Sequence, residues 1–162
     1  MQTFLPFHSF TASASVLDYR RLGKQRVECK QLLSALGHEI VDGKLMPIPA
    51  DSPGKAGWAN HPAAKMWRGY ERALAEYQRI MIMEWISRGY QNNMVMIGTD
   101  EIGNSYPDPP WLGDPSFHAS HRSNLLRKDP VHYGQFDWDE PDTLEYVWPT
   151  VPVNGLTKTT EF

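Results

Sequence analysis

The chain has 162 residues, of which 41% are hydrophobic and 12% aromatic, which is typical of one folded domain with one core. Its formal net charge is −3, but Lys and Arg outnumber Asp and Glu by 15 to 13 over residues 1–136, whereas residues 137–162 hold 1 against 6. The single cysteine, Cys29, excludes an intrachain disulfide and suits a reducing cytosol. No apolar run is long enough for a membrane span, and the N-terminus does not resemble a signal peptide.

We expect a compact, mostly α single domain of three main helices with long loops. The first helix starts near Ser13 or Ser15, both of which are good N-terminal caps. It runs to Leu36, after which Gly37 can adopt the left-handed conformation that ends helices.

The middle of the chain predicts a loop and then the clearest helix. Residues 38–60 are rich in Pro and Gly, and Asp42–Gly43 is typical of a short hairpin turn. The second helix is capped by Asn60 or His61, has a proline in its first turn, and closes at Arg88.

The last third of the chain combines a loop, a helix and an acidic tail. Residues 90–113 predict a long loop. Asp114 caps a third helix that ends before Asp129, and a further turn of helix runs to Tyr133. After residue 136 the chain is acidic and broken by prolines, and we expect its apolar segment to dock on the body through Tyr146, Val147 and Trp148.

Two charged side chains fall on helix faces that are otherwise apolar. Arg26 shares an arc with Leu22 and Cys29, and Glu84 shares one with Tyr77. A charge that faces a core needs a partner of opposite sign, so we expect Arg26 to pair with Glu84. Such a pair is either a structural ion pair or part of a site at the floor of a cleft.

The third helix concentrates cations and imidazoles, with no acidic residue between its two capping aspartates. His118, His121 and Arg122 fall within one arc of about 100°. The histidines could ligate a metal, donate hydrogen bonds to phosphate, or be satisfied core residues, and zinc would need a further ligand. With the basic first helix they predict a surface that follows nucleic-acid phosphates. The candidate nucleic-acid-binding residues are Arg20, Arg21, Lys24, His118, His121, Arg122, Asn124, Arg127 and Lys128.

Three separated motifs agree on one family. They are LDYRRLGKQRV at 17–27, NHPAAKMWRGYERALAEYQRIMIMEWISRGY at 60–90 and PPWLGDPSFHASHRSNLLRKDPVHY at 109–133. In this order they resemble the pyrimidine-dimer DNA glycosylases of the endonuclease V type, closest to the bacterial and phage branch.

The resemblance implies a DNA-repair enzyme, a glycosylase with associated AP-lyase activity that needs no metal or cofactor. Its partner is duplex DNA with a damaged or modified pyrimidine, and it acts as a monomer in the cytoplasm of a bacterial or phage-infected cell. A free N-terminal α-amine attacks the sugar C1′, the base leaves, an imine forms, and β-elimination nicks the strand. An α-amine ordinarily has a pKa of about 7.7–8.0, so a useful fraction is nucleophilic at neutral pH.

Two positions depart from the family pattern. The family's nucleophile is a Thr exposed by removal of the initiator Met, whereas here Gln2 follows Met1, so the amine of Met1 itself is the candidate. The family's catalytic Glu follows a Tyr-Arg pair, but Tyr19–Arg20 is followed by Arg21, and the other possible register places Gly23 there.

We therefore expect another carboxylate to act, either Glu84 or Glu28. Glu28 falls on the opposite helix face from Arg26. Arg26 and Arg122 fit as phosphate or site arginines. The candidate catalytic set is Met1, Arg26 and Glu84, with no metal ligands.

The expected domain organisation is a helical glycosylase-like domain over residues 1–136 and an acidic tail over residues 137–162 that packs on it or trails from it. Two other functions remain open. One is a DNA base-modifying enzyme on the same scaffold that does not cut the strand, and the other is a non-catalytic DNA-binding protein with salt-dependent affinity.

Overall fold

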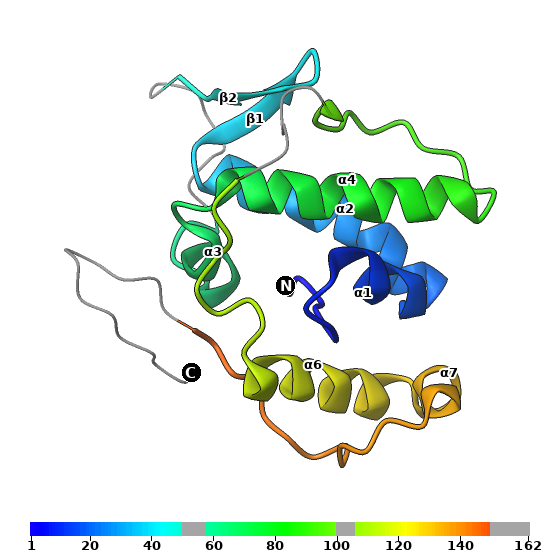
Figure 1. The fold of residues 1–162 in the computed structure, drawn as a ribbon. Coiled ribbons are helices and arrows are strands. Elements are labelled where there is room, and N and C mark those ends of the chain that lie inside the picture. Colours follow the sequence, from blue (N-terminus) through cyan, green and yellow to red (C-terminus); the bar gives the residue numbers. More distant parts are fainter. Residues whose placement is uncertain (50–57, 100–105, 150–162) are drawn as a thin grey trace.

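A computed structural model describes residues 1–49, 58–99 and 106–149. In these ranges the chain is mostly helical and has one two-stranded hairpin, which confirms the expected fold class (Figure 1). The elements are α1 (Phe10–Val16), α2 (Tyr19–Ala35), β1 (His38–Val41), β2 (Lys44–Pro47), α3 (Pro62–Trp67), α4 (Glu71–Ser87), α6 (Pro115–Lys128), α7 (Pro130–Tyr133) and the 3-10 turn η1 (Gly134–Phe136).

The first predicted helix is two helices, α1 and α2. The hydroxyl of Ser9 caps α1, and the carboxylate of Asp18, in extended backbone, accepts the Arg21 N–H and caps α2. Ser13 and Ser15 are therefore both wrong as caps, because they lie inside α1. The predicted end is confirmed: Gly37, with φ of 82°, follows the last turn of α2.

The second predicted helix is also divided, into α3 and α4. His61 caps α3 as expected, since its Nδ1 accepts the Ala63 N–H. The helix stops after Trp67 because Gly69 has a φ of 86°, which helical residues do not adopt. The predicted end of α4 is confirmed, with Gly89 at φ 91°.

The hairpin and the third helix agree with the sequence. β1 pairs antiparallel with β2 through the turn at Asp42 and Gly43, whose φ values of 52° and 76° suit a tight hairpin turn. The carboxylate of Asp114 accepts the Ser116 N–H and caps α6, and Asp129 caps α7 in the same way.

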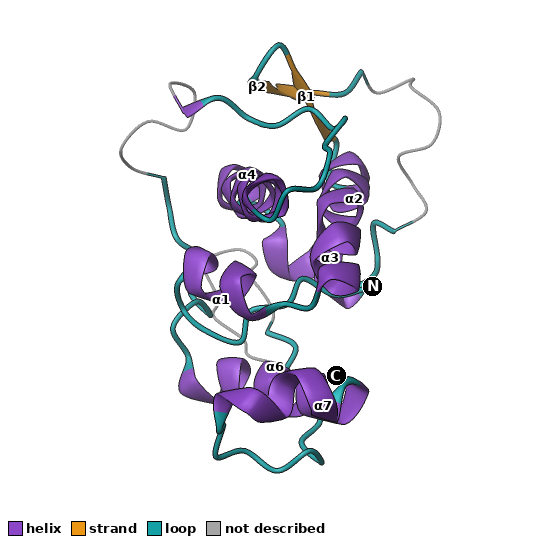
Figure 2. Ribbon diagram, turned by 90° about the vertical axis from the view of Figure 1, so that its right-hand side faces the viewer, coloured by secondary structure: helices purple, strands orange, loops and turns teal. Residues whose placement is uncertain are grey.

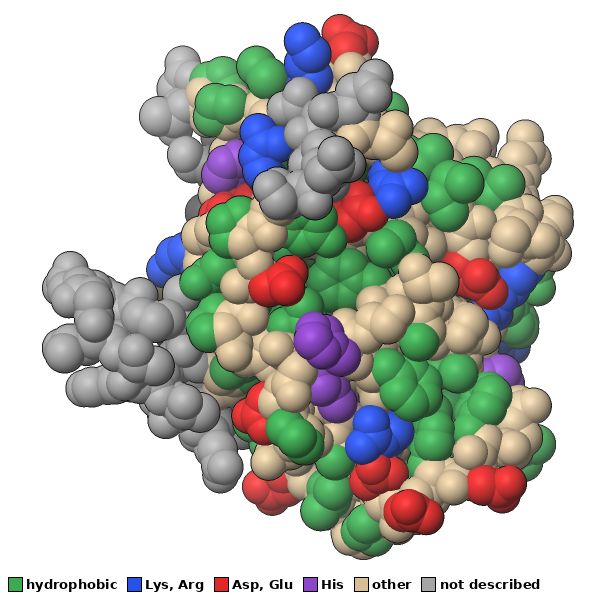
Figure 3. Space-filling view, in the orientation of Figure 1, with side chains coloured by type: hydrophobic (Ala, Val, Ile, Leu, Met, Phe, Trp, Pro, Cys, Tyr) green, Lys and Arg blue, Asp and Glu red, His purple; other side chains and the backbone are tan. Residues whose placement is uncertain are grey.

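The helices form two layers with the start of the chain between them. α2, α3 and α4 lie together on one side, with the hairpin beyond them, and α6 and α7 lie on the other (Figures 1 and 2). In both views the N-terminus lies between these layers. On the face drawn in Figure 3, Lys and Arg side chains alternate with Asp and Glu and with apolar side chains, so that face carries no continuous basic area.

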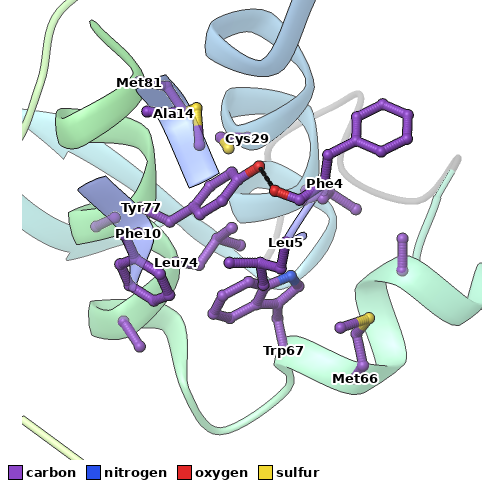
Figure 4. Packing of buried hydrophobic residues seen from close by; sticks show 14 of the residues in the cluster. Phe4, Leu5, Phe10, Ala14, Cys29, Met66, Trp67, Leu74, Tyr77 and Met81 are labelled. Atoms are coloured by element: carbon purple, nitrogen blue, oxygen red, sulfur yellow. Dashed lines mark hydrogen bonds between the residues drawn. The ribbon is translucent and has the colours of Figure 1, made fainter. Parts of the chain in front are cut away.

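The core lies where α1, α2, α3 and α4 meet. Leu22, Trp67 and Tyr77 are fully buried there. Leu5, which precedes α1, and Phe10, the first residue of α1, are buried in the same cluster (Figure 4). The beginning of the chain is thus part of the core and not a loose extension.

Candidate functional site

The N-terminal arm, residues 1–9, is anchored by hydrogen bonds to side chains of three helices, α2, α3 and α4. The Thr3 hydroxyl accepts from Trp67 Nε1 of α3 at 3.0 Å. The Phe4 carbonyl accepts from the Tyr77 hydroxyl of α4 at 2.7 Å (Figure 4), and the Phe4 N–H donates to Gln25 Oε1 of α2 at 3.0 Å. Residues 2–5 are buried, whereas Met1 remains partly exposed.

On the opposite side, α6 binds the arm through its two histidines, His118 and His121. The Leu5 N–H donates to His121 Nδ1 at 2.9 Å, and His118 Nδ1 donates to the Leu5 carbonyl at 2.8 Å. His118 Nε2 accepts the Gly113 N–H at 2.9 Å, so both of its ring nitrogens are used. Burial lowers the pKa of His121 to about 3 and also lowers that of His118, so both rings are neutral at neutral pH. Three of the four ring nitrogens therefore bind backbone, and the fourth, His121 Nε2, has no partner within the described residues but is buried away from solvent.

The other polar side chains of α6 bind the chain that follows it. Arg122 donates to the Pro6 carbonyl at 2.6 Å and pairs with Glu140 at 2.6 Å. Asn124 and Arg127 donate to backbone carbonyls of residues 142–144. Tyr146, Val147 and Trp148 pack against the core. The face that we expected to bind a poly-anion is therefore occupied by the arm and by residues 140–148.

A cavity of about 940 Å³ opens where the arm begins. Its wall combines the start of the arm with polar side chains of α2 and the end of α6: Met1, Gln2, Arg20, Arg21, Lys24, Gln25, Glu28 and Lys128. Five predicted site residues meet here, namely Met1, Arg20, Arg21, Lys24 and Lys128. Cations from two segments that lie about a hundred residues apart in the sequence thus surround the first residue.

Cationic side chains outnumber carboxylates in the cavity wall, with Arg20, Arg21, Lys24 and Lys128 against Asp18, Glu28 and Asp129. Burial, together with the charges of Arg21, Arg127 and Lys24, lowers the pKa of Lys128, as expected where like charges crowd. Arg21 is paired with Asp18 at 3.2 Å, but within the described ranges neither Lys24 nor Lys128 has an ion-pair partner. Such a cluster favours an anionic ligand that neutralises it.

Asp18 stays charged beside this cluster. Burial alone would raise its pKa, but hydrogen bonds from the Tyr133 hydroxyl and from Arg21 outweigh burial and lower it. Burial, together with the hydrogen bond to Asp18, raises the pKa of Tyr133. Asp18 therefore holds α2 to α7 at the edge of the cavity.

The expected pair of Arg26 with Glu84 is wrong. Glu84 accepts from Arg88 at 3.0 Å, because the two lie four residues apart on α4 and so share a helix face. Arg26 instead donates to Asn92 Oδ1 at 2.7 Å and lies 4.2 Å from the centroid of the Trp85 ring. Burial lowers the pKa of Arg26.

Three carboxylates line the cavity. Asp18 and Asp129 cap α2 and α7 by accepting the N–H groups of Arg21 and His132, so Glu28 is the lining carboxylate that caps no helix. It accepts a hydrogen bond from Gln25 Nε2 at 3.2 Å. Glu84 and Arg26 lie outside the cavity wall, as do the candidates His118, His121, Arg122, Asn124 and Arg127. Sequence reasoning missed Gln25, although the signal was present: it lies three residues after Leu22, so a polar side chain had to face the core.

Residues 1–98, more than half of the chain, match the family described as pyrimidine dimer DNA glycosylase. The chain belongs to this family. The part of the chain that matches the family contains the arm and all the cavity side chains of α2. No curated protein and no solved structure gives a match to the chain.

Membership in the pyrimidine dimer DNA glycosylases makes this chain a repair-type enzyme whose substrate is DNA. Within the described ranges, no helix combines the length and the apolar character that a membrane crossing requires. In the same ranges, no three His, Cys, Asp or Glu side chains gather as a metal site.

Proposed function

We propose that the cavity binds the sugar of a damaged pyrimidine nucleotide, and that the α-amine of Met1 is the nucleophile of a metal-independent glycosylase and AP lyase. The most direct support is that residues 2–5 are buried, whereas Met1 is partly exposed and lines the cavity. Because the arm already fixes the position of the amine, little conformational entropy is lost when the amine approaches C1′, and such preorganisation accelerates enzymatic reactions.

The reaction conserves atoms and electrons without an added oxidant or reductant. The uncharged amine forms a bond to C1′ while the glycosidic bond breaks, and the base leaves with the electron pair and takes up a proton. The nitrogen gives up one proton, the C1′–O4′ bond breaks as the nitrogen lone pair forms the C1′=N bond, O4′ takes up a proton, and a protonated imine remains. Loss of a C2′ proton then expels the 3′ phosphate and cuts the strand. Water releases the amine.

Glu28 is the carboxylate that we assign to this chemistry. Its negative charge would stabilise the positive charge that develops on the sugar and on the imine nitrogen. It could also accept the C2′ proton in the elimination step. Arg20, Arg21, Lys24 and Lys128 would hold the flanking phosphates, since phosphate contacts from Lys and Arg position a protein on DNA.

The test is borohydride trapping on duplexes with an abasic site or a pyrimidine dimer, with intact-mass analysis of the N-terminus. We expect a covalent protein–DNA adduct that survives chelators and is abolished by acetylation of the α-amine. Glu28→Gln should slow adduct formation about 10²- to 10⁴-fold, the usual range for losing a proton-transfer group. The matched control, Glu84→Gln, should stay within about threefold of the wild type, because Glu84 pairs with Arg88 outside the cavity.

Each result bears on a separate part of the proposal. An adduct that persists after acetylation removes Met1 from the mechanism. Base release without any adduct would show a glycosylase without the lyase step. If Glu84→Gln is the slower variant, Glu28 is not the catalytic carboxylate.

A further inference from the structure

Gln25 is a buried side chain whose amide is fully hydrogen bonded at the wall of the cavity. Only 1% of it is exposed. Its Oε1 accepts from the Phe4 N–H at 3.0 Å and lies 2.6 Å from the Tyr77 hydroxyl, whose single proton is shared between this oxygen and the Phe4 carbonyl. Its Nε2 donates to the Gln2 carbonyl at 2.9 Å and to Glu28 Oε2 at 3.2 Å. One amide therefore contacts both the arm that carries Met1 and the carboxylate of Glu28.

We infer that Gln25 is a positioning residue that fixes the arm, and with it the amine of Met1, relative to the carboxylate of Glu28. The inference rests on the function proposed above for Met1 and Glu28. The two hydrogens of an amide nitrogen have fixed directions in the amide plane. Donation of one to Gln2 and the other to Glu28 therefore sets the angle between the arm and the carboxylate.

The orientation of this amide is determined by its neighbours. The Phe4 N–H can only donate, so it requires Oε1, and the Gln2 carbonyl can only accept, so it requires Nε2. A flipped amide would face a donor with a donor and an acceptor with an acceptor. The N–H that points to Glu28 is thus built into the packing of the arm.

The other anchors of the arm do not reach the carboxylate. Trp67 holds Thr3, and His121 holds Leu5, each through the arm alone. In the described part of the chain, Glu28 accepts no side-chain hydrogen bond except the one from Gln25. Loss of Gln25 would therefore leave the arm anchored but Glu28 free to change rotamer.

The test is Gln25→Met, which keeps length and volume but donates no hydrogen bond. The control is Gln78→Met, the same change at another buried glutamine, which donates to the Arg26 carbonyl away from the cavity. With saturating abasic duplex, we expect Gln25→Met to trap at least tenfold more slowly while its Kd for DNA stays within about threefold. Gln78→Met should trap at the wild-type rate after both are checked for folding by thermal unfolding.

A double-mutant cycle separates positioning from structure. If Gln25 acts through Glu28, Gln25→Met adds nothing further to Glu28→Gln. An equal slowing in both backgrounds, or wild-type trapping by Gln25→Met, overturns the inference. Failure of the proposed function looks different, because Glu28→Gln itself would then trap normally.

A second variant serves if Gln25→Met does not fold. Gln25→Glu keeps the acceptor for Phe4 and loses both donors while it is ionised. Its deficit relative to the wild type should shrink toward acid pH, where the new carboxyl regains a proton to donate. A deficit that does not change with pH contradicts the inference.

Discussion

His121 is fully buried, and its ring accepts the Leu5 N–H at 2.9 Å. Burial lowers its pKa to about 3, whereas histidine ordinarily titrates near 6.5. Between these values the unfolded chain binds a proton that the folded chain excludes. The contribution of His121 to stability is therefore complete above pH 6.5 and decreases as the pH falls toward 3, by at most about 1.4 kcal/mol per pH unit.

This linkage predicts how acid affects unfolding. From pH 7 to pH 5 the wild type should lose about 2 kcal/mol of unfolding free energy through His121 alone. His121→Gln keeps an acceptor for the Leu5 N–H but does not titrate, so its loss over the same range should be smaller. Urea unfolding of both proteins at the two pH values measures the difference, and equal losses would show that His121 does not carry the linkage.

The histidines also show what a helical arc can and cannot predict. Their shared face was evident from the spacing, and a satisfied core position was one of the interpretations. Their partner, Leu5, lies more than a hundred residues away in the sequence. Nothing local to the third helix indicates that the start of the chain packs there, so a phosphate-binding role looked equally suitable.

At the scale of elements, the breaks between helices direct side chains to the arm. The turn at Gly69 separates α3 from α4, and Trp67 and Tyr77, one from each helix, hold neighbouring residues of the arm. Helix ends were predictable because caps are local: His61 and Asp114 were both right. The breaks were not, since a glycine within an apolar periodic pattern is also compatible with one continuous helix.

Gly69→Ala should lower the unfolding free energy by about 1–2 kcal/mol, because L-residues resist positive φ. A Cβ there would meet nothing within 4 Å, so the cost is that of the backbone alone. Gly134→Ala is the matched control, since it also meets nothing within 4 Å but has a negative φ of −63°. It should be neutral within about 0.5 kcal/mol. Chemical unfolding compares the two, and equal effects would contradict the assigned role of Gly69.

At the scale of the whole molecule, the net charge of −3 does not show that the cations divide into two groups, one bound by the protein's own groups and one lining the cavity. Those of α6 that face the arm and residues 140–148 are bound to the protein's own carbonyls and to Glu140. Of those at the cavity, Arg21 is paired with Asp18, but Lys24 and Lys128 have no ion-pair partner within the described ranges. The sequence predicted both basic segments but could not show which of them the folded chain neutralises itself.

This division makes the salt dependence of DNA binding a test of where the phosphates lie. Each phosphate contact contributes about 0.9 to the slope of log K against log salt concentration. Lys24→Gln should therefore reduce the slope by about 0.9, whereas Lys30→Gln, the same change at another exposed lysine of α2 outside the cavity, should leave it unchanged. Arg127→Gln should also leave it unchanged, because this guanidinium is bound to backbone carbonyls of residues 142–144. A lower slope for Arg127→Gln would return the basic face of α6 to the DNA interface, because only a cation that releases counterions from DNA alters that slope.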